Sequence, residues 1–202
     1  MLTIYHVPGT RSFRPIWVCE ELGVPYQLER IDFAREFRFS SSYLRLNPLG
    51  KVPVLMDDDF TMYESGAMVQ FILERYGNGR LTPKPGTPDS AMYLQWSWFA
   101  EATFARPLGD MMQHTRLKPP AERLPAMVED GKQRAMLCIN ALEAALTNRD
   151  YLVASTFGAA DIQMGYSLLL AQNLELMTSA HPRLLAYHQR LAARPGYAVA
   201  KS

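Results

Sequence analysis

Apolar and polar residues alternate with two different rhythms along the chain, and the change of rhythm divides the sequence into two parts. Up to residue 77, short apolar runs of strand length alternate with stretches that have the helical period. This pattern predicts strands over 2–6, 26–31, 52–56 and 60–63, and helices over 13–22, 41–46 and 64–76. The order of these elements predicts a mixed sheet whose first two strands run parallel.

Glycine and proline mark the boundaries of these elements. Gly23 is suited to the left-handed conformation that ends a helix, and Pro25 lies just beyond it. Residues 78–88, NGRLTPKPGTP, hold three prolines and two glycines, a composition that neither continues a helix nor joins a sheet. The sequence therefore predicts a first domain over 1–77, a linker over 78–88 and a second domain over 89–202.

The second part has the helical period throughout. Asp89 is predicted to cap a long helix, which Pro107 is expected to kink. The next helix carries a stripe of mostly small residues that would let a neighbouring helix approach closely: Gly131, Ala135, Cys138, Leu142 and Ala145. A third helix is predicted from about Ala159 to Leu176. A short fourth one opens at residues 181–182 and ends near residue 194.

Composition narrows the function classes. A chain of 202 residues with 48% apolar residues can bury a sizeable core. Its 21 Lys and Arg nearly balance its 20 Asp and Glu, so the net charge creates no electrostatic field that would favour binding to nucleic acid or to an anionic membrane. No leader peptide or apolar run of membrane-spanning length occurs, so a cytoplasmic protein is expected. Cys19 and Cys138 lie far apart without metal-ligand spacing, which predicts two buried reduced thiols and no metal site.

The turn between the first strand and the first helix carries two hydroxyls and a cation, in the order Thr10-Arg11-Ser12. A helix N-terminus has unpaired N–H groups and a partial positive charge, so it favours anions and lowers the pKa of a thiol held there. A hydroxyl at the same place adds a donated hydrogen bond to the sulfur. The alternative is that Ser12 is only the N-cap of the helix.

Two further stretches carry polar or backbone groups suited to a peptide ligand. In NPLGKVPVL, residues 47–55, a cis Val52–Pro53 bond would turn the N–H and C=O of Val52 outward, where an extended peptide can pair with them. An ordinary trans proline at a strand start is the alternative. At the start of the last helix of this part, Ser65 is suited to hold a carboxylate and Glu64 to accept from an ammonium group. The alternative there is again a helix cap.

Taken together, three stretches resemble the cytosolic glutathione transferases, in the bacterial form with a serine- or threonine-type turn. They are PGTRSFRPIWVCEELGVPYQLERID, NPLGKVPVL and YESGAMVQFILERY, and a proline-rich linker and a helical half follow them. The resemblance implies an α/β thioredoxin-like domain that binds glutathione, and an all-α second domain that forms much of the acceptor-substrate pocket. It also implies a homodimer.

The resemblance assigns roles to residues of all three stretches. Thr10 occupies the position of the hydroxyl that steadies the thiolate, and Ser12 is the second candidate. The residues that would bind the rest of glutathione are Lys51 at the glycyl carboxylate, Val52 beside a cis Pro53 at the cysteinyl backbone, and Glu64 with Ser65 at the γ-glutamyl end. Arg11, which stands about where the beta class carries cysteine, is assigned to the acceptor pocket with Phe104 and Met111.

The function that this resemblance implies is conjugation of the glutathione thiolate to small apolar electrophiles. Glutathione is then a co-substrate, and no cofactor is needed. Two alternatives stay open. One is another glutathione-dependent enzyme on the same fold, such as a peroxidase, a reductive dehalogenase or an isomerase. The other is a transferase-like binding or assembly module that has lost catalysis.

Overall fold

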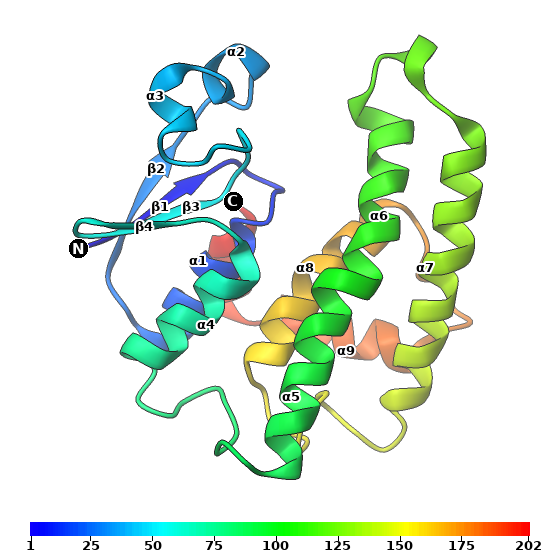
Figure 1. Cartoon of the computed structure of the whole chain (residues 1–202). Coiled ribbons are helices and arrows are strands. Elements are labelled where there is room, and N and C mark those ends of the chain that lie inside the picture. Colours follow the sequence, from blue (N-terminus) through cyan, green and yellow to red (C-terminus); the bar gives the residue numbers. More distant parts are fainter. The chain divides into compact units, whose positions relative to one another are not determined.

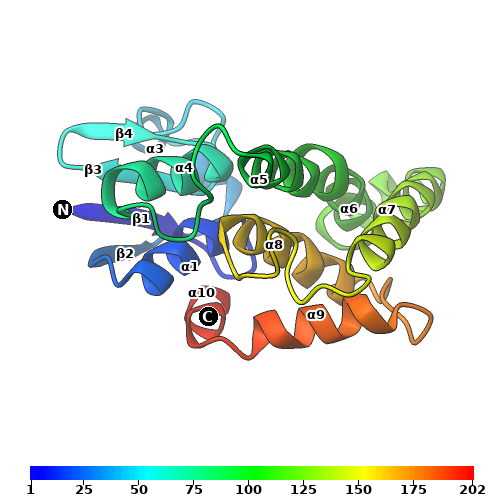
Figure 2. The ribbon, with the colours of Figure 1, turned by 90° about the horizontal axis from the view of Figure 1, so that it is seen from below.

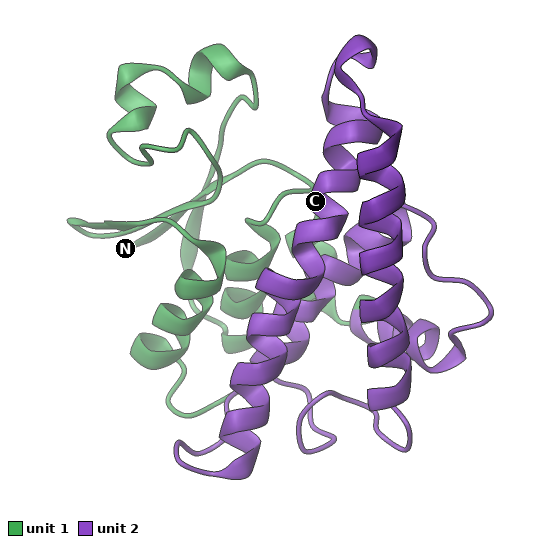
Figure 3. Cartoon of the chain, turned by 45° about the vertical axis from the view of Figure 1, so that its right-hand side comes forward, with its two compact units in different colours: residues 1–81, 192–202 green, residues 82–191 purple.

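The computed structural model describes residues 1–202, and it divides into two compact units (Figure 3). The first unit comprises Met1–Leu81 together with Ala192–Ser202, and the second comprises Thr82–Leu191. The boundary at residues 81–82 falls within the proline-rich stretch. No sequence pattern indicated that the last residues of the chain fold with the first unit.

The first unit is built on a four-stranded sheet with the strand order β2-β1-β3-β4. Its strands are β1 (Leu2–His6), β2 (Tyr26–Arg30), β3 (Val54–Asp57) and β4 (Phe60–Met62). The β1 and β2 strands are parallel, while β1 with β3 and β3 with β4 are antiparallel. This is the mixed sheet that the sequence predicts.

Helices lie on both sides of this sheet. The α1 (Phe13–Leu22) and α4 (Ser65–Tyr76) helices cover one face, and α10 (Pro195–Lys201) packs against α1 (Figures 1 and 2). The short helices α2 (Arg35–Arg38) and α3 (Ser41–Leu44) lie on the other side (Figure 1). Along β1, Leu2, Ile4 and His6 are buried and the residues between them are partly exposed. A histidine therefore occupies the third inward position of a strand whose other two inward side chains are apolar.

The first helix ends as its sequence predicts. Gly23 adopts φ 64° and ψ 30°, and its N–H bonds to the carbonyl oxygens of Cys19 and Glu20. A residue with a Cβ is disfavoured in this left-handed conformation, so glycine suits the position. The C-terminal end of this helix is thus fixed, while its first turn carries the candidate site.

The second unit is all helical. Its regular helices are α5 (Pro88–Trp98), α6 (Ala105–Met112), α7 (Pro125–Ala145), α8 (Ala159–Asn173) and α9 (Pro182–Ala192). Two π-helical segments, η1 (Phe99–Phe104) and η2 (Gln113–Leu117), continue α5 and α6, and a 3₁₀ turn, η3 (Pro120–Glu122), precedes α7. The thioredoxin-like first part and the helical second part together form the fold class that the sequence predicts.

The cap of the long helix differs from the prediction. Its N-cap is Thr87 rather than Asp89, because the Thr87 side chain accepts from the backbone N–H of Ser90 at 3.2 Å and Pro88 occupies the first turn. Asp89 lies in that first turn. The helix departs from regular α-helical geometry in the π-helical segment that ends at Phe104, ahead of Pro107. The kink expected at Pro107 stays a prediction.

The predicted close approach of helices at Gly131 is confirmed. A Cβ added to Gly131 of α7 would lie 2.7 Å from Cγ of Met111 and 3.0 Å from the carbonyl oxygen of Pro107, both on α6. Any larger residue would push these two helices apart, so the small side chain is required by the packing.

Both cysteines are free and buried, as predicted. Burial raises the pKa of Cys19 to about 12, with a smaller contribution from Glu20, so its thiol stays protonated and poorly reactive. No group of three or more His, Cys, Asp or Glu side chains is arranged to hold a metal ion. None of the helices combines the length and the apolar character needed to cross a membrane.

Candidate active site

The turn that follows β1 presents the hydroxyl of Thr10 at its outer edge. The backbone N–H of Thr10 bonds to the carbonyl oxygen of Val7 at 3.3 Å, and the Thr10 hydroxyl donates to the same oxygen at 2.7 Å. The Thr10 side chain is half-buried. The turn thus fixes the position of a hydroxyl on a residue that remains partly exposed.

Ser12 lies deeper in the same corner. It is fully buried, and its Oγ lies 2.8 Å from Nδ1 of His6 and 2.8 Å from Oγ1 of Thr10. Although Ser12 occupies the N-cap position of α1, its side chain makes no capping hydrogen bond. The alternative that Ser12 serves only as a helix cap therefore has no support in the contacts of its hydroxyl.

Fewer backbone N–H groups are unpaired at the N-terminus of α1 than the four that a helix start ordinarily leaves free. The N–H of Phe13 bonds to the carbonyl oxygen of Thr10 at 3.1 Å, and that of Arg14 bonds to the carbonyl oxygen of Arg11 at 3.2 Å. Pro15 has no N–H to offer. The helix dipole still favours an anion at this end, but side-chain hydroxyls become more important as donors.

The second stretch presents an open backbone edge. The Val52–Pro53 bond is cis, which confirms that prediction. The preceding carbonyl, of Lys51, accepts from the Tyr43 hydroxyl at 2.9 Å and from Nδ2 of Asn47 at 2.8 Å. The N–H and C=O of Val52 pair with no other backbone group of the chain. The side chain of Lys51 is exposed.

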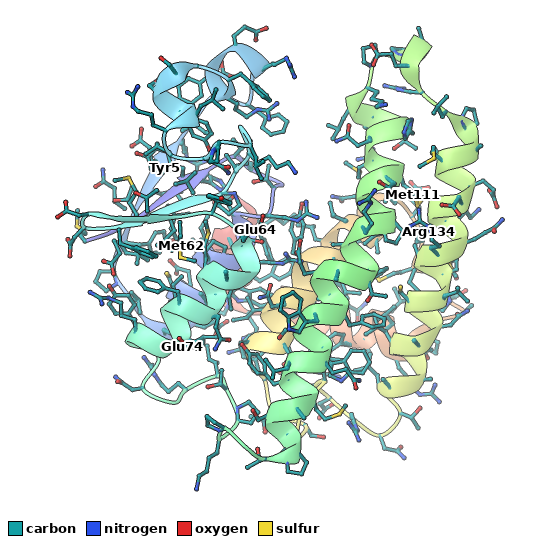
Figure 4. The ribbon with its side chains drawn as sticks, in the orientation of Figure 1. Tyr5, Met62, Glu64, Glu74, Met111 and Arg134 are labelled. Atoms are coloured by element: carbon teal, nitrogen blue, oxygen red, sulfur yellow. The ribbon has the colours of Figure 1, made fainter.

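The third stretch combines an unusual backbone conformation with a buried cation. Glu64 adopts φ 77° and ψ 101°, which is uncommon for a residue with a Cβ and is often found at functional sites. Figure 4 shows Glu64 where the chain enters α4. The next residue, Ser65, accepts a hydrogen bond of 3.1 Å from Nη1 of the fully buried Arg14. Ser65 is therefore a partner of a cation rather than the cap of α4.

Sequence reasoning missed two residues of this site, His6 and Arg14. Each is a polar side chain inside an otherwise apolar stretch, and each is at most 1% exposed. A charged or polar residue at an inward position of a strand, or beside apolar residues in the first turn of a helix, is the signal that would have found them.

The residues assigned to the acceptor pocket lie in separate elements. Arg11 lies in the turn of the first unit and is half-buried. Phe104 is fully buried and packs on Phe99, with ring centroids 6.5 Å apart. Met111 is 4% exposed and packs on Gly131. The last two have the surroundings of core residues, and the role of all three in an acceptor pocket stays a prediction.

Comparison with known proteins identifies the family. The glutathione S-transferase N-terminal domain model matches residues 1–74, and the C-terminal domain model matches residues 109–195. The chain belongs to the glutathione S-transferase family. It is 26% identical to glutathione S-transferase 3 of Schizosaccharomyces pombe, covering 99% of this chain and 86% of that protein. It is 29% identical to glutathione S-transferase GstB of Escherichia coli, covering 96% and 95%.

A solved structure agrees with these relatives. The theta class glutathione S-transferase of Xanthomonas axonopodis pv. citri, crystallised with glutathione bound, superposes with a TM-score of 0.84 at 27% identity. The match covers 98% of this chain and 96% of that one.

Proposed function

We propose that the protein is a glutathione transferase that binds glutathione on its first unit and transfers the thiolate to small apolar electrophiles. The observation that carries this proposal is the pair of hydroxyls at the start of α1. Thr10 is the one at the outer edge, within reach of a ligand, while Ser12 is fully buried behind it. Thr10 is therefore the hydroxyl that contacts the sulfur, and Ser12 supports it.

The rest of glutathione is held by the other two stretches, together with Arg14 of the first. The buried guanidinium of Arg14, the Ser65 hydroxyl and the N-terminus of α4 together form a positive environment for the α-carboxylate of the γ-glutamyl residue. Glu64 accepts from the ammonium group of that residue. The open backbone edge of Val52 pairs with the cysteinyl residue as a neighbouring strand would.

Two further groups complete the proposed site. Lys51 is exposed and reaches the glycyl carboxylate. Arg11, in the opening turn, adds positive charge near the sulfur.

The chemical step follows from the stabilised thiolate. The thiol of bound glutathione gives its proton to solvent, and the Thr10 hydroxyl and the dipole of α1 favour the remaining negative charge. The sulfur then forms a bond to an electrophilic carbon. In substitution a halide leaves with its bonding pair; in addition the π electron pair of an activated alkene shifts onto its activating group, which then takes a proton from solvent. A lower thiol pKa increases the fraction of thiolate at neutral pH, although it also reduces the intrinsic reactivity of each thiolate somewhat.

The burial of both cysteines argues against a mechanism in which glutathione forms a mixed disulfide with the protein. Cys19 is fully buried with a strongly raised pKa, and burial also raises the pKa of Cys138. A mechanism that forms a mixed disulfide between glutathione and the protein needs an accessible thiolate, which neither residue provides. Reduction of a peroxide by glutathione's own thiol would use the same site, and assays with both kinds of substrate distinguish it from conjugation.

We also propose a cytoplasmic homodimer. Buried free thiols fit a reducing compartment. Each unit exposes large apolar side chains of the kind that subunit interfaces cover, namely Phe60 and Tyr63 in the first unit and Leu94 and Trp98 in the second.

Substitution of Thr10 tests the catalytic assignment. In Thr10→Ala the thiolate loses one charge-assisted hydrogen bond, worth about 1.5–3 kcal/mol, so the midpoint of the pH profile of conjugation should rise by about one to two pH units. The measurement is the pH profile of kcat/KM with a nitro-activated aryl halide, and the affinity for glutathione is measured by calorimetry. Thr147→Ala, at an exposed position of the second unit, is the matched control. An unchanged midpoint in Thr10→Ala would contradict the role of Thr10, and no heat on mixing wild-type protein with glutathione would contradict the function.

A further inference from the structure

A chain of three short hydrogen bonds leads from the interior of the first unit through Thr10 to the carbonyl oxygen of Val7. Nδ1 of His6 lies 2.8 Å from Oγ of Ser12, which lies 2.8 Å from Oγ1 of Thr10, and that hydroxyl donates to the carbonyl oxygen of Val7 at 2.7 Å. His6 is 1% exposed and Ser12 is 0% exposed, so water does not compete for the bond between these two side chains. The chain connects a buried imidazole to the hydroxyl that we assign to the sulfur.

The number of available protons determines the direction of each bond. The carbonyl oxygen of Val7 can only accept, so the Thr10 proton is used there. The contact between Thr10 and Ser12 must then use the Ser12 proton, and the contact between Ser12 and His6 must use a proton on Nδ1. A longer contact of 3.3 Å from Ser12 to the Val7 oxygen competes for the same Ser12 proton. With all three short contacts made, His6 carries a proton on Nδ1 and donates it to Ser12.

We propose that His6 is a positioning residue which, acting through Ser12, holds the Thr10 hydroxyl as a donor to the glutathione sulfur and so increases the fraction of bound glutathione present as thiolate. This inference rests on the proposed function. When the sulfur arrives, the Thr10 proton turns from the Val7 oxygen to the sulfur. Oγ1 of Thr10 continues to accept from Ser12, and a hydroxyl whose oxygen accepts a hydrogen bond is a stronger donor.

The surroundings of His6 fit this role better than a purely structural one. Its Nε2 is buried and has no hydrogen-bond partner, which costs stability that an apolar side chain at the same inward position would not cost. Burial, together with the nearby charge of Arg30, lowers the pKa of His6 to about 4. The ring is therefore neutral at physiological pH and supplies a donor without adding a charge beside the thiolate.

Two substitutions at this position separate donation from packing. His6→Leu removes the donor and fills the space of the imidazole with an apolar side chain of similar size. His6→Asn instead places an amide N–H near the position of Nδ1. The fraction of thiolate in the complex is followed by its ultraviolet absorbance as pH is varied. We expect His6→Leu to move the midpoint of this titration upward. The kcat/KM at neutral pH should fall by about three- to tenfold for every pH unit by which the midpoint rises, because the smaller thiolate fraction is partly offset by the higher reactivity of a more basic thiolate. His6→Asn should recover part of the loss, and glutathione affinity should change little in either variant.

A double-mutant cycle gives an independent readout. If His6 acts only through Thr10, His6→Leu has no further effect on the midpoint in a Thr10→Ala background. Ser12→Ala removes the middle of the chain and should raise the midpoint even if His6→Leu does not fold. In wild-type protein, nitrogen NMR of labelled histidine should place the His6 proton on Nδ1.

The outcomes distinguish this inference from the proposed function. An unchanged midpoint in folded His6→Leu or in Ser12→Ala, equal changes of the midpoint in His6→Leu and His6→Asn, or a proton on Nε2 would each overturn the role of His6. If wild-type protein forms no thiolate on binding glutathione, the proposed function fails instead.

Discussion

Thr10 and Ser12 carry the same functional group two residues apart, yet we propose different roles for them because their surroundings differ. The Thr10 hydroxyl lies at the edge of the turn and needs only a change of proton direction to meet a ligand. The Ser12 hydroxyl is enclosed by three protein groups and has no freedom to turn outward. The proposal that Thr10 contacts the sulfur and Ser12 supports this contact therefore rests on the difference in their burial, since both side chains carry the same hydroxyl.

The buried imidazole also predicts how stability depends on pH. The pKa of His6 lies at about 4 in the folded protein, below its ordinary value of 6.5. Protonation therefore favours the unfolded chain: the contribution of His6 is complete above about pH 6.5 and is lost as pH falls toward 4. The loss can reach about 3 kcal/mol, since one pKa unit is worth about 1.4 kcal/mol.

Urea denaturation at a series of pH values measures this loss. The free energy of unfolding should fall more steeply on the acid side in wild-type protein than in His6→Asn, because an amide does not titrate. Equal acid-side losses in the two proteins would show that His6 does not titrate as its burial implies.

At the residue scale, the sequence predicts the parts of the candidate site that have a local signature. A Thr-Arg-Ser turn before a helix, a Val-Pro before a strand and a Glu-Ser at a helix start are all visible as short patterns, and the cis Val52–Pro53 bond is confirmed. His6 and Arg14 have no such pattern. Their importance depends on contacts to Ser12 and Ser65, and the latter contact joins residues 51 positions apart.

At the scale of elements, predictions succeeded where the apolar period and the end signals agreed. The α1 helix has the predicted bounds because an apolar run starts after a polar turn and ends at a glycine that adopts the left-handed conformation. Predictions failed where several residues competed for one role. Thr87 and Asp89 are both good caps, and Pro88 favours the first because proline is suited to the position after the cap.

The start of α8 shows how a missing side chain is compensated. Gly158 occupies the N-cap position and has no side chain to bond the helix, but Asp161 bonds back to the Gly158 N–H at 2.8 Å. The same carboxylate accepts from the N–H of Leu152 at 3.1 Å and from the Tyr187 hydroxyl at 2.6 Å. Half of a capping box is thus retained, and its buried carboxylate also ties two other segments of the second unit to this helix.

At the scale of the whole molecule, the exposed apolar side chains predict a dimer. Sedimentation equilibrium should return about twice the chain mass of 22.9 kDa. Trp98→Ser should increase the monomer fraction, because Trp98 is 68% exposed and an interface would bury it. Leu137→Ser is the control, since Leu137 is 71% exposed on α7, a helix that carries none of the four apolar side chains proposed for the interface. A monomeric wild-type protein would contradict the proposed homodimer.

The last residues of the chain belong to the first unit, where α10 packs against α1. We expect this packing to be needed for the candidate site. Tyr197 of α10 is 3% exposed, and its ring lies edge-on to Phe13 at 5.0 Å and to Trp17 at 5.1 Å, both on α1. Tyr197→Ala would leave a cavity beside the helix whose first turn follows the Thr10 corner, so unfolding free energy should fall by about 3–5 kcal/mol and glutathione affinity should weaken with it. Denaturant unfolding and calorimetry measure both quantities. Val199→Ala, at a 44% exposed position of the same helix, should change neither. An equal effect of the two substitutions would show that the Tyr197 ring has no special role in α10. Wild-type stability in Tyr197→Ala would show that the packing of α10 does not support α1.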